Sequence, residues 1–162
     1  IVINELSGVV TPFCVAIGDN TELDILNIIS NISGSSGHHV GVSEDQIGRK
    51  YLPELKQGIV CVSLDNMVNK FNLPFPNHIK IDTDGLEEEI LKGGRGVFKN
   101  PRLKSVLMEV TGINEAGVRV ERFMRNIGFG LTHPINLQKK HSRFRREKAG
   151  KGFIRNLIFT RN

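Results

Sequence analysis

Strand-like and helix-like segments alternate through the middle of this chain, and this alternation limits the fold more than any other feature. The strand-like segments are short apolar runs rich in β-branched residues, at 58–63, 78–82 and 104–110. Amphipathic helical patterns follow them, at 65–71, 86–98 and 115–127. A strand–helix–strand order favours parallel strands joined by right-handed crossovers. The sequence therefore predicts an α/β fold built on a parallel sheet.

Three more apolar runs, at 9–17, 23–28 and 153–160, are also predicted to be strands. After the second of them, residues 30–48 are rich in Ser, Gly and His and have neither a helical nor a strand period. At about nineteen residues this segment is longer than a plain connection, and we expect a mobile or functional loop. Solvated side chains are the simplest interpretation of His38 and His39. A lid that brings an imidazole over a substrate is the alternative.

The ends of the predicted helices carry typical capping residues. Ser63 is a candidate N-cap of the first helix, and Asp84 is one for the helix at 86–98. The first turn of that second helix holds Glu87, Glu88 and Glu89, where carboxylates interact favourably with the helix dipole. Gly128 is a predicted C-cap.

Length and composition indicate one folded domain. The chain has 162 residues, of which 39% are hydrophobic and 24% are charged, so it can bury a core without disulfides. The two cysteines, Cys14 and Cys61, lie in apolar runs and are predicted to be buried, reduced thiols. No uncharged apolar run approaches the roughly 18 residues of a membrane span. We expect a cytoplasmic protein without a membrane segment, whose natural N-terminus lies before Ile1.

The positive charge of the chain is concentrated near its C-terminus. The formal net charge is +5, and residues 139–162 contribute nine basic residues and one acidic residue, so the remainder is acidic. Within this segment, 139–152 is predicted to be a basic loop before the last strand. Phe144 lies between basic residues there, as in proteins that bind nucleic acid through phosphate contacts and stacking. A solvated loop is the simpler interpretation, and recognition of an acidic sugar or phosphate is a third.

Carboxylates lie at or near the ends of predicted strands. Asp82 ends one strand, Glu109 lies near the end of the next, and Asp19 follows the first. Ligands of open parallel sheets bind outside the carboxyl ends of the strands. The pattern predicts a small-molecule site with acceptors for hydroxyl or amine groups and a general base. Local helix caps and ion pairs are the competing explanation.

The densest acidic cluster, residues 82–87, is not predicted to bind a metal. Oxygen ligands suit Mg²⁺ or Ca²⁺, but the stretch lacks the spacing of a calcium-binding loop, and a helix begins too soon. No phosphate-binding glycine motif is present either, because 34–41 fits neither common pattern. Stabilisation of the helix N-terminus together with one functional acid is favoured.

Four segments in a fixed order carry a family resemblance. They read SLDNMV at 63–68, IKIDTDGLE at 79–87, ILKG at 90–93 and VLMEV at 106–110. They resemble the FkbM family of S-adenosylmethionine-dependent methyltransferases, whose members show TLDDLV, IKIDVEGxExxVLKGA and ILxEI. Residues 11–19 (TPFCVAIGD) are similar to the third-strand segment of that family. The resemblance covers most of 9–109 and, more loosely, 156–159.

The resemblance implies a Rossmann-like class I methyltransferase fold with S-adenosylmethionine as cofactor. Family members are generally O-methyltransferases that act on hydroxyl groups of sugars or secondary metabolites. The implied site residues are Asp82, Asp84 and Glu87 as base or acceptor-binding acids, and Ala16, Ile17 and Asp19 on the cofactor side. Asp84 stands where the family usually has glutamate.

One departure from the family pattern affects the whole prediction. The cofactor loop of the family, Asp-x-Gly-Ala-Asn-x-Gly, is absent, and so is the acid on the second strand that binds ribose. We therefore expect a partial domain over 1–162 that lacks the first two strands and binds cofactor weakly unless another chain supplies them. The open sheet edge favours self-association into a homo-oligomer. A non-catalytic remnant that keeps the fold for binding is the alternative.

Overall fold

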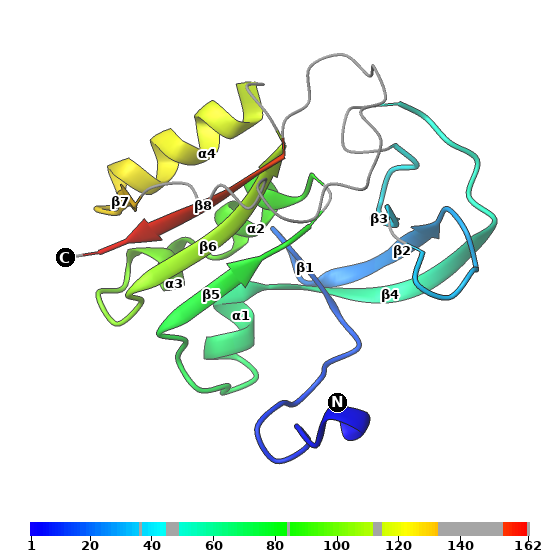
Figure 1. Cartoon of the computed structure of the whole chain (residues 1–162), viewed down its shortest axis with the longest axis horizontal. Helices are drawn as coiled ribbons and strands as arrows, with labels where there is room; N and C mark the ends of the chain where they lie inside the picture. The colour runs from blue at the N-terminus through cyan, green and yellow to red at the C-terminus, as the bar shows by residue number, and fades with distance from the viewer. Residues whose placement is uncertain (36, 45–48, 84, 112–114, 133–153, 162) are drawn as a thin grey trace.

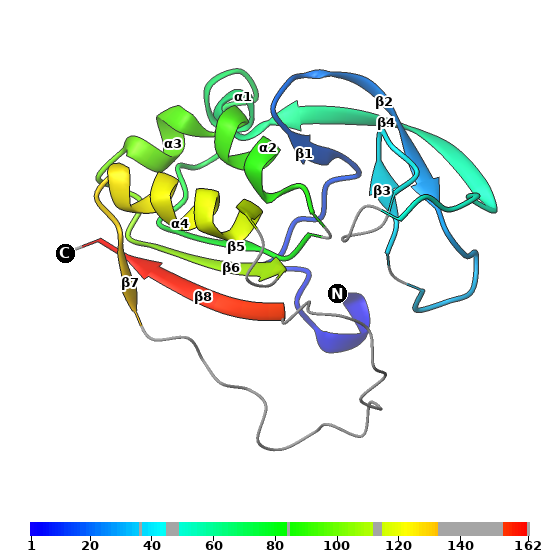
Figure 2. The ribbon, with the colours of Figure 1, turned by 90° about the horizontal axis from the view of Figure 1, so that it is seen from above.

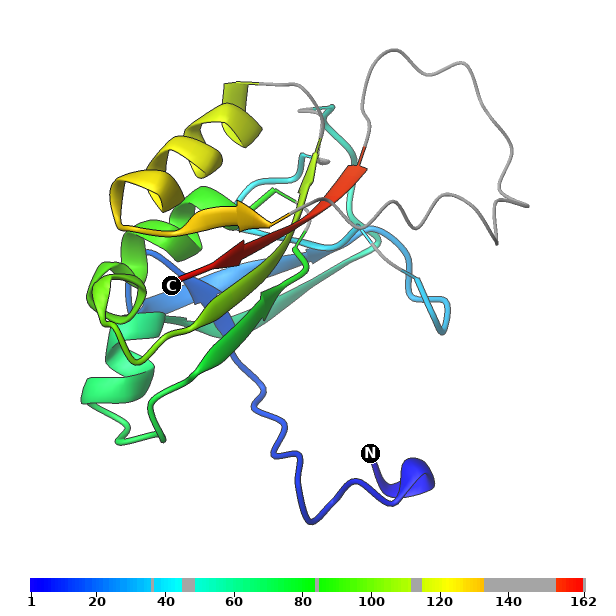
Figure 3. The same cartoon turned by 60° about the vertical axis from the view of Figure 1, so that its left-hand side comes forward.

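The computed structural model describes residues 1–35, 37–44, 49–83, 85–111, 115–132 and 154–161, and the structural statements below concern these residues. In chain order the elements are η1 Val2–Asn4, β1 Ala16–Gly18, β2 Glu22–Ile28, β3 His39–Val40, β4 Leu55–Ser63, α1 Leu64–Asn69, β5 His78–Ile81, α2 Glu87–Gly93, α3 Arg95–Lys99, β6 Ser105–Thr111, α4 Glu115–Asn126, β7 Gly130–Thr132 and β8 Ile154–Thr160. Before β1 the chain runs away from both sheets (Figure 3).

The described strands form two four-stranded sheets, in the orders β1-β4-β2-β3 and β5-β6-β8-β7 (Figure 1). β1 runs parallel to β4, and β5 runs parallel to β6 in the register His78↔Ser105 to Ile81↔Met108. The other pairings are antiparallel. The α/β prediction is confirmed, and so is the parallel pairing of β5 with β6. The expectation of a single parallel sheet is wrong, because β2 and β8 return antiparallel beside β4 and β6.

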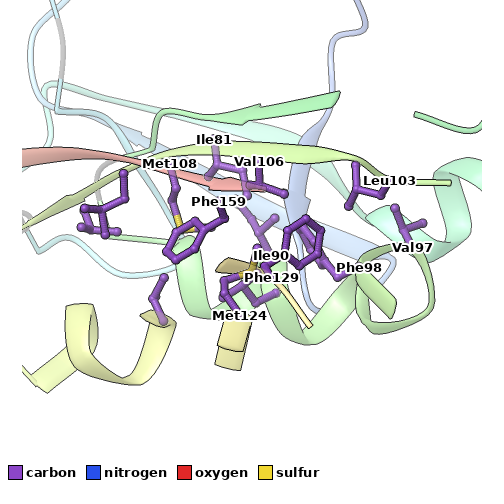
Figure 4. Packing of buried hydrophobic residues seen from close by; sticks show 14 residues of the cluster. Ile81, Ile90, Val97, Phe98, Leu103, Val106, Met108, Met124, Phe129 and Phe159 are labelled. Carbon is purple, nitrogen blue, oxygen red and sulfur yellow. The ribbon is translucent and has the colours of Figure 1, made fainter. Parts of the chain in front are cut away.

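The helices α1 to α4 lie on one side of the β5-β6-β8-β7 sheet, as Figure 2 shows. The hydrophobic core lies between these helices and the sheet. From the sheet, Val106, Met108 and Phe159 are fully buried. They face apolar side chains from the helices, among them Ile90, Phe98 and Met124 (Figure 4). The alternation of buried residues along β6 has the period of two expected of a strand with one covered face.

Helix boundaries follow the capping signals only in part. The Ser63 hydroxyl accepts a hydrogen bond from the Asn66 amide at 3.3 Å, so the predicted N-cap is confirmed. Gly128 has the positive φ, 88°, of a C-terminal glycine. The helix predicted at 86–98 is divided into α2 and α3 at Gly94. Asp84, its predicted N-cap, lies outside the described residues.

Three further sequence predictions need correction. The strand predicted at 9–17 is confined to β1, and Cys14, which precedes β1, is therefore exposed, whereas Cys61 is buried as predicted. The predicted loop at 30–48 contains the short strand β3. The basic loop predicted at 139–152 lies outside the described residues and stays a prediction. None of the described helices combines the length and the apolar character that crossing a membrane requires.

Candidate functional site

A cavity of about 700 Å³ lies between the facing strands β1 and β5. Its walls are mostly apolar and come from four places: Val15–Ile17, Gly37–Val40, Ile79–Thr83, and the helical or helix-flanking residues Leu64, Leu86 and Ile90. Cavities of this size, apolar with a few polar groups, are typical of sites for small molecules. Figure 2 shows the elements that carry these residues, with β1 and α2 on one side and β5 below them.

Asp82 lies at the carboxyl end of β5 and lines this cavity together with Ala16 and Ile17. The structure thus brings together three residues that the sequence predicted for one site. Among the described lining residues, Asp82 is the only carboxylate. Its side chain is about half exposed, and its Oδ2 accepts a hydrogen bond from Lys80 Nζ at 2.5 Å. That hydrogen bond is the main reason why the pKa of Lys80 is raised.

Two of the predicted strand-end acids are not part of the cavity lining. Asp19 is exposed beyond the end of β1, where its Oδ1 accepts a hydrogen bond from Asn20 Nδ2 at 3.2 Å. Glu109 lies opposite Asn156 in the β6–β8 register. The expected group of three acids on one edge is therefore reduced to Asp82 in the described part of the cavity. The cofactor role of Asp19 stays a prediction, and Asp84 lies outside the described residues.

Glu87 is buried in the first turn of α2 and reaches the cavity only through a neighbour. It is 8% exposed and does not line the cavity. Its Oε1 accepts two hydrogen bonds, from Thr83 Oγ1 at 2.9 Å and from the Gly85 amide at 3.2 Å. Burial raises the pKa of Glu87, and the two hydrogen bonds act in the opposite direction. Thr83 does line the cavity, so Glu87 is one hydrogen bond away from it.

The raised pKa of Glu87 predicts a pH-dependent stability. A carboxyl group whose pKa is higher in the folded chain stabilises the fold fully below its unfolded pKa of about 4.3, and this stabilisation is lost as pH rises through the folded pKa. The Glu87→Gln variant has no carboxyl group at this position, so it does not lose stability in this way as pH rises. The free energy of unfolding of the variant, relative to the wild type, is therefore expected to increase between about pH 4 and about pH 7.5. Urea denaturation at both pH values measures the change.

Glu88→Gln provides a control with the opposite sign. The Glu88 carboxylate pairs with Arg119 at 2.7 Å, and the hydrogen bond to Arg119 is the main cause that lowers the pKa of Glu88. Its stabilisation is present above the unfolded pKa and lost as pH falls, so Glu88→Gln should lose stability relative to the wild type as pH rises. Equal pH trends in the two variants contradict the opposite pKa shifts of Glu87 and Glu88.

Two histidines on one wall of the cavity present different ring nitrogens. The Ile29 amide donates to His38 Nδ1 at 3.2 Å, so the proton of a neutral His38 ring is on Nε2. His39 Nδ1 lies 2.8 Å from the Val40 carbonyl, which can only accept, so His39 carries its proton on Nδ1. Both rings line the cavity, as the lid interpretation of these residues expects.

Two residues of the cavity lining, Lys80 and Thr83, were not predicted from the sequence. Lys80 precedes Asp82 by two residues, and side chains at this spacing in a strand share a face, so an ion pair could have been predicted. Thr83 precedes Glu87 by four residues, and the two lie on either side of the start of α2. The turn that brings them together includes Gly85, which has a positive φ of 105°. That turn has no sequence signal beyond the glycine itself. Within the described residues, no three His, Cys, Asp or Glu side chains lie close enough to hold a metal ion.

The cavity lining offers some, but not all, of the groups that the cofactor class implied by the motifs requires. Ala16 and Ile17 offer apolar surface suited to the face of an adenine, and Asp82 offers a carboxylate to accept hydrogen bonds from an amine or hydroxyl. The described lining contains no second carboxylate, so the group that binds ribose in the family pattern is not provided by these residues.

Comparison with known proteins identifies a family. The model of the methyltransferase FkbM domain matches residues 3–131, which is well over half of the chain. No curated protein sequence and no solved structure matches this chain significantly. The match spans β1 to the start of β7 and includes all of the cavity lining described above. The chain belongs to the FkbM methyltransferase domain family.

Proposed function

We propose that this chain is part of an S-adenosylmethionine-dependent O-methyltransferase that acts on a hydroxyl group of a sugar or secondary metabolite. The observation that carries the proposal is the position of Asp82, at the carboxyl end of a parallel strand and at the wall of a large apolar cavity. Ligands of α/β sheets bind at that end of the strands. The family membership supports the methyltransferase activity.

The two sheets are consistent with two parts of one Rossmann-like sheet. Among the described strands, β1 pairs only with β4, and β5 pairs only with β6, so the facing sides of β1 and β5 have no strand beside them. We propose that two further strands, supplied by residues outside this chain, join these edges. They would fill part of the cavity and leave the end that contains Asp82 open to ligand.

Each site residue has a defined task in this proposal. When bound, the sulfonium cofactor supplies the methyl group. Ala16 and Ile17 provide the apolar wall that orients it, and Asp82 accepts hydrogen bonds from the cofactor or the acceptor. Holding the reacting atoms in a near-attack arrangement can supply up to roughly 7–11 kcal/mol of the barrier reduction in favourable systems.

The test is a calorimetric titration of S-adenosylmethionine into the chain described here and into a longer form that contains the two proposed strands, called the full-length form below. We expect micromolar binding by the full-length form and much weaker binding by this chain alone, because the added strands complete the site. The absence of binding by the full-length form contradicts the cofactor assignment and favours a non-catalytic remnant.

Asp82→Asn is expected to lower methyl transfer by the full-length form about 10- to 100-fold and to leave the fold intact. The variant is isosteric but loses a charged hydrogen-bond acceptor, which is worth about 1.5–3 kcal/mol. Release of S-adenosylhomocysteine measures turnover, and circular dichroism checks the fold. Glu121→Gln, on the far helix α4 beside Arg125, is the matched control. Turnover by Asp82→Asn equal to that of the control removes Asp82 from the site.

A further inference from the structure

The hydrogen bond between Thr83 and Glu87 connects the cavity to a buried carboxylate. Thr83 lines the cavity, and its Oγ1 lies 2.9 Å from Glu87 Oε1. An ionised carboxylate can only accept, so the Thr83 hydroxyl donates its proton to Glu87. The lone pairs of Thr83 Oγ1 are then available to accept a hydrogen bond from a hydroxyl group in the cavity. With Glu87 ionised, this arrangement lets a proton pass from the cavity to Glu87.

Glu87 is held in place for this task. The Gly85 amide donates to the same Oε1 at 3.2 Å, which fixes the carboxylate at the start of α2. With only 8% of the residue exposed, water has little access to it. Burial raises the pKa of Glu87, which strengthens it as a proton acceptor, although the geometry alone defines the path. Asp82, the carboxylate that lines the cavity, accepts a hydrogen bond from Lys80 Nζ at Oδ2, which leaves its Oδ1 for a ligand.

We propose that Thr83 and Glu87 form a two-residue proton relay that deprotonates the hydroxyl group of the methyl acceptor. This inference rests on the proposed function. The acceptor oxygen uses a lone pair to form the bond to the methyl carbon, and the carbon–sulfur bond breaks with its electron pair going to sulfur. The acceptor proton moves to Thr83 Oγ1 as the proton of Thr83 moves to Glu87 Oε1. Glu87 ends neutral, and the thioether and the methyl ether are the products.

The relay makes Thr83 a catalytic residue, because its oxygen contacts the acceptor. Glu87 acts through Thr83 and does not touch the acceptor. This arrangement explains how a carboxylate outside the cavity lining can serve as the base that the sequence predicted. It also predicts that the two side chains function as one unit, so that losing either removes the whole path.

The first experiment measures the hydrogen bond without any ligand. The Glu87 carboxyl carbon is followed by NMR titration in ¹³C-glutamate-labelled protein. Because the Thr83 hydrogen bond lowers the pKa of Glu87, Thr83→Val is expected to raise that pKa further, and Thr83→Ser should restore it. An unchanged pKa in Thr83→Val shows that the hydrogen bond is absent in solution, and overturns the relay.

The second experiment measures the relay in turnover by the full-length form. The probe is transfer of tritiated methyl groups from S-adenosylmethionine to a panel of methyl glycosides with free hydroxyl groups. Thr83→Val and Glu87→Gln are each expected to lower kcat about 10²- to 10⁴-fold, the range of general-base catalysis, with cofactor affinity unchanged by calorimetry. The double variant should be no slower than the slower single variant, and Thr83→Ser should stay within about tenfold of the wild type.

These experiments distinguish a failure of the relay from a failure of the proposed function. If the wild type binds cofactor and transfers methyl groups, but Thr83→Val keeps its kcat within about threefold, the relay is wrong and the proposed function stands. Additive losses in the double variant also overturn the relay. If the wild type neither binds cofactor nor transfers methyl groups to the panel, the proposed function fails, and the relay fails with it.

Discussion

Gly93→Ala is expected to lower the free energy of unfolding by about 3 kcal/mol, at the upper end of the usual penalty for overpacking. A Cβ atom at Gly93 would lie 2.1 Å from the Gly18 carbonyl oxygen and 2.8 Å from the Asp19 Cα. Both are backbone atoms, so no side-chain rotation relieves the clash. The better helix propensity of alanine, at most about 1 kcal/mol, offsets only part of it.

The same substitution should also disturb the candidate site. Gly93 ends α2, and its close approach to Gly18 sets the distance between α2 and the end of β1. Moving β1 displaces Ala16 and Ile17, which form one wall of the cavity. The full-length form carrying Gly93→Ala is therefore expected to bind S-adenosylmethionine more weakly even under conditions where it is fully folded.

Two other glycines provide controls for this prediction. An added Cβ at Gly58 meets nothing within 4 Å, so Gly58→Ala should change stability by less than about 1 kcal/mol. At Gly96 the Cβ would lie 3.1 Å from the Asp65 carboxylate, which is a side chain that can move, and an intermediate effect is expected. Urea denaturation of the three variants gives the ranking. A Gly93→Ala protein as stable as Gly58→Ala contradicts the close packing of α2 on β1.

Local patterns predicted the elements that depend on local interactions. Ser63 caps α1 through an amide three residues later, and both partners can be seen in the sequence. The short apolar run at 104–110 predicted β6, one face of which is covered by helices. These features need no information about distant parts of the chain.

Predictions failed where a distant partner decides the structure. Residues 9–17 have high β propensity, but a strand requires a neighbour, and β4 pairs only with Ala16–Gly18. The break at Gly94 is stabilised from outside the helix, because the carboxylate of Asp65 accepts hydrogen bonds from the Gly96 and Val97 amides at 2.9 and 2.8 Å. The helical pattern of 86–98 does not predict this break, because Asp65 lies outside that segment.

In the candidate site too, local patterns predicted some features, whereas others depend on contacts that the sequence does not reveal. Asp82, Ala16 and Ile17 were predicted because strand ends and family motifs can be recognised in the sequence, and they do share one cavity. Motif matching also placed Glu87 at the site, but not its burial or its contact with Thr83. Those depend on the turn at Gly85 and on the packing of α2, which no pattern of residue types specifies.

Arg161→Ala is expected to lower the free energy of unfolding by about 3 kcal/mol, because it removes three hydrogen bonds from one partly buried charged group. The Arg161 guanidinium donates to the carbonyl oxygens of Phe98 at 2.9 Å, Asn100 at 2.6 Å and Ile127 at 2.8 Å. It also lies 4.2 Å from the centre of the Phe129 ring. One side chain after β8 thus satisfies carbonyls at the ends of both α3 and α4.

Two further variants separate the hydrogen bonds of Arg161 from its contact with an aromatic ring. Arg102 lies 4.5 Å from the centre of the Phe75 ring, so Arg102→Ala should cost only about 0.5–1 kcal/mol. Arg161→Lys should recover less than half of the loss, because a single ammonium group cannot reach carbonyls that a planar guanidinium bridges. Thermal and urea denaturation measure all three variants. If Arg161→Ala costs no more than Arg102→Ala, the carbonyls at these helix ends are satisfied without Arg161, and β8 is held to the helices by apolar packing alone.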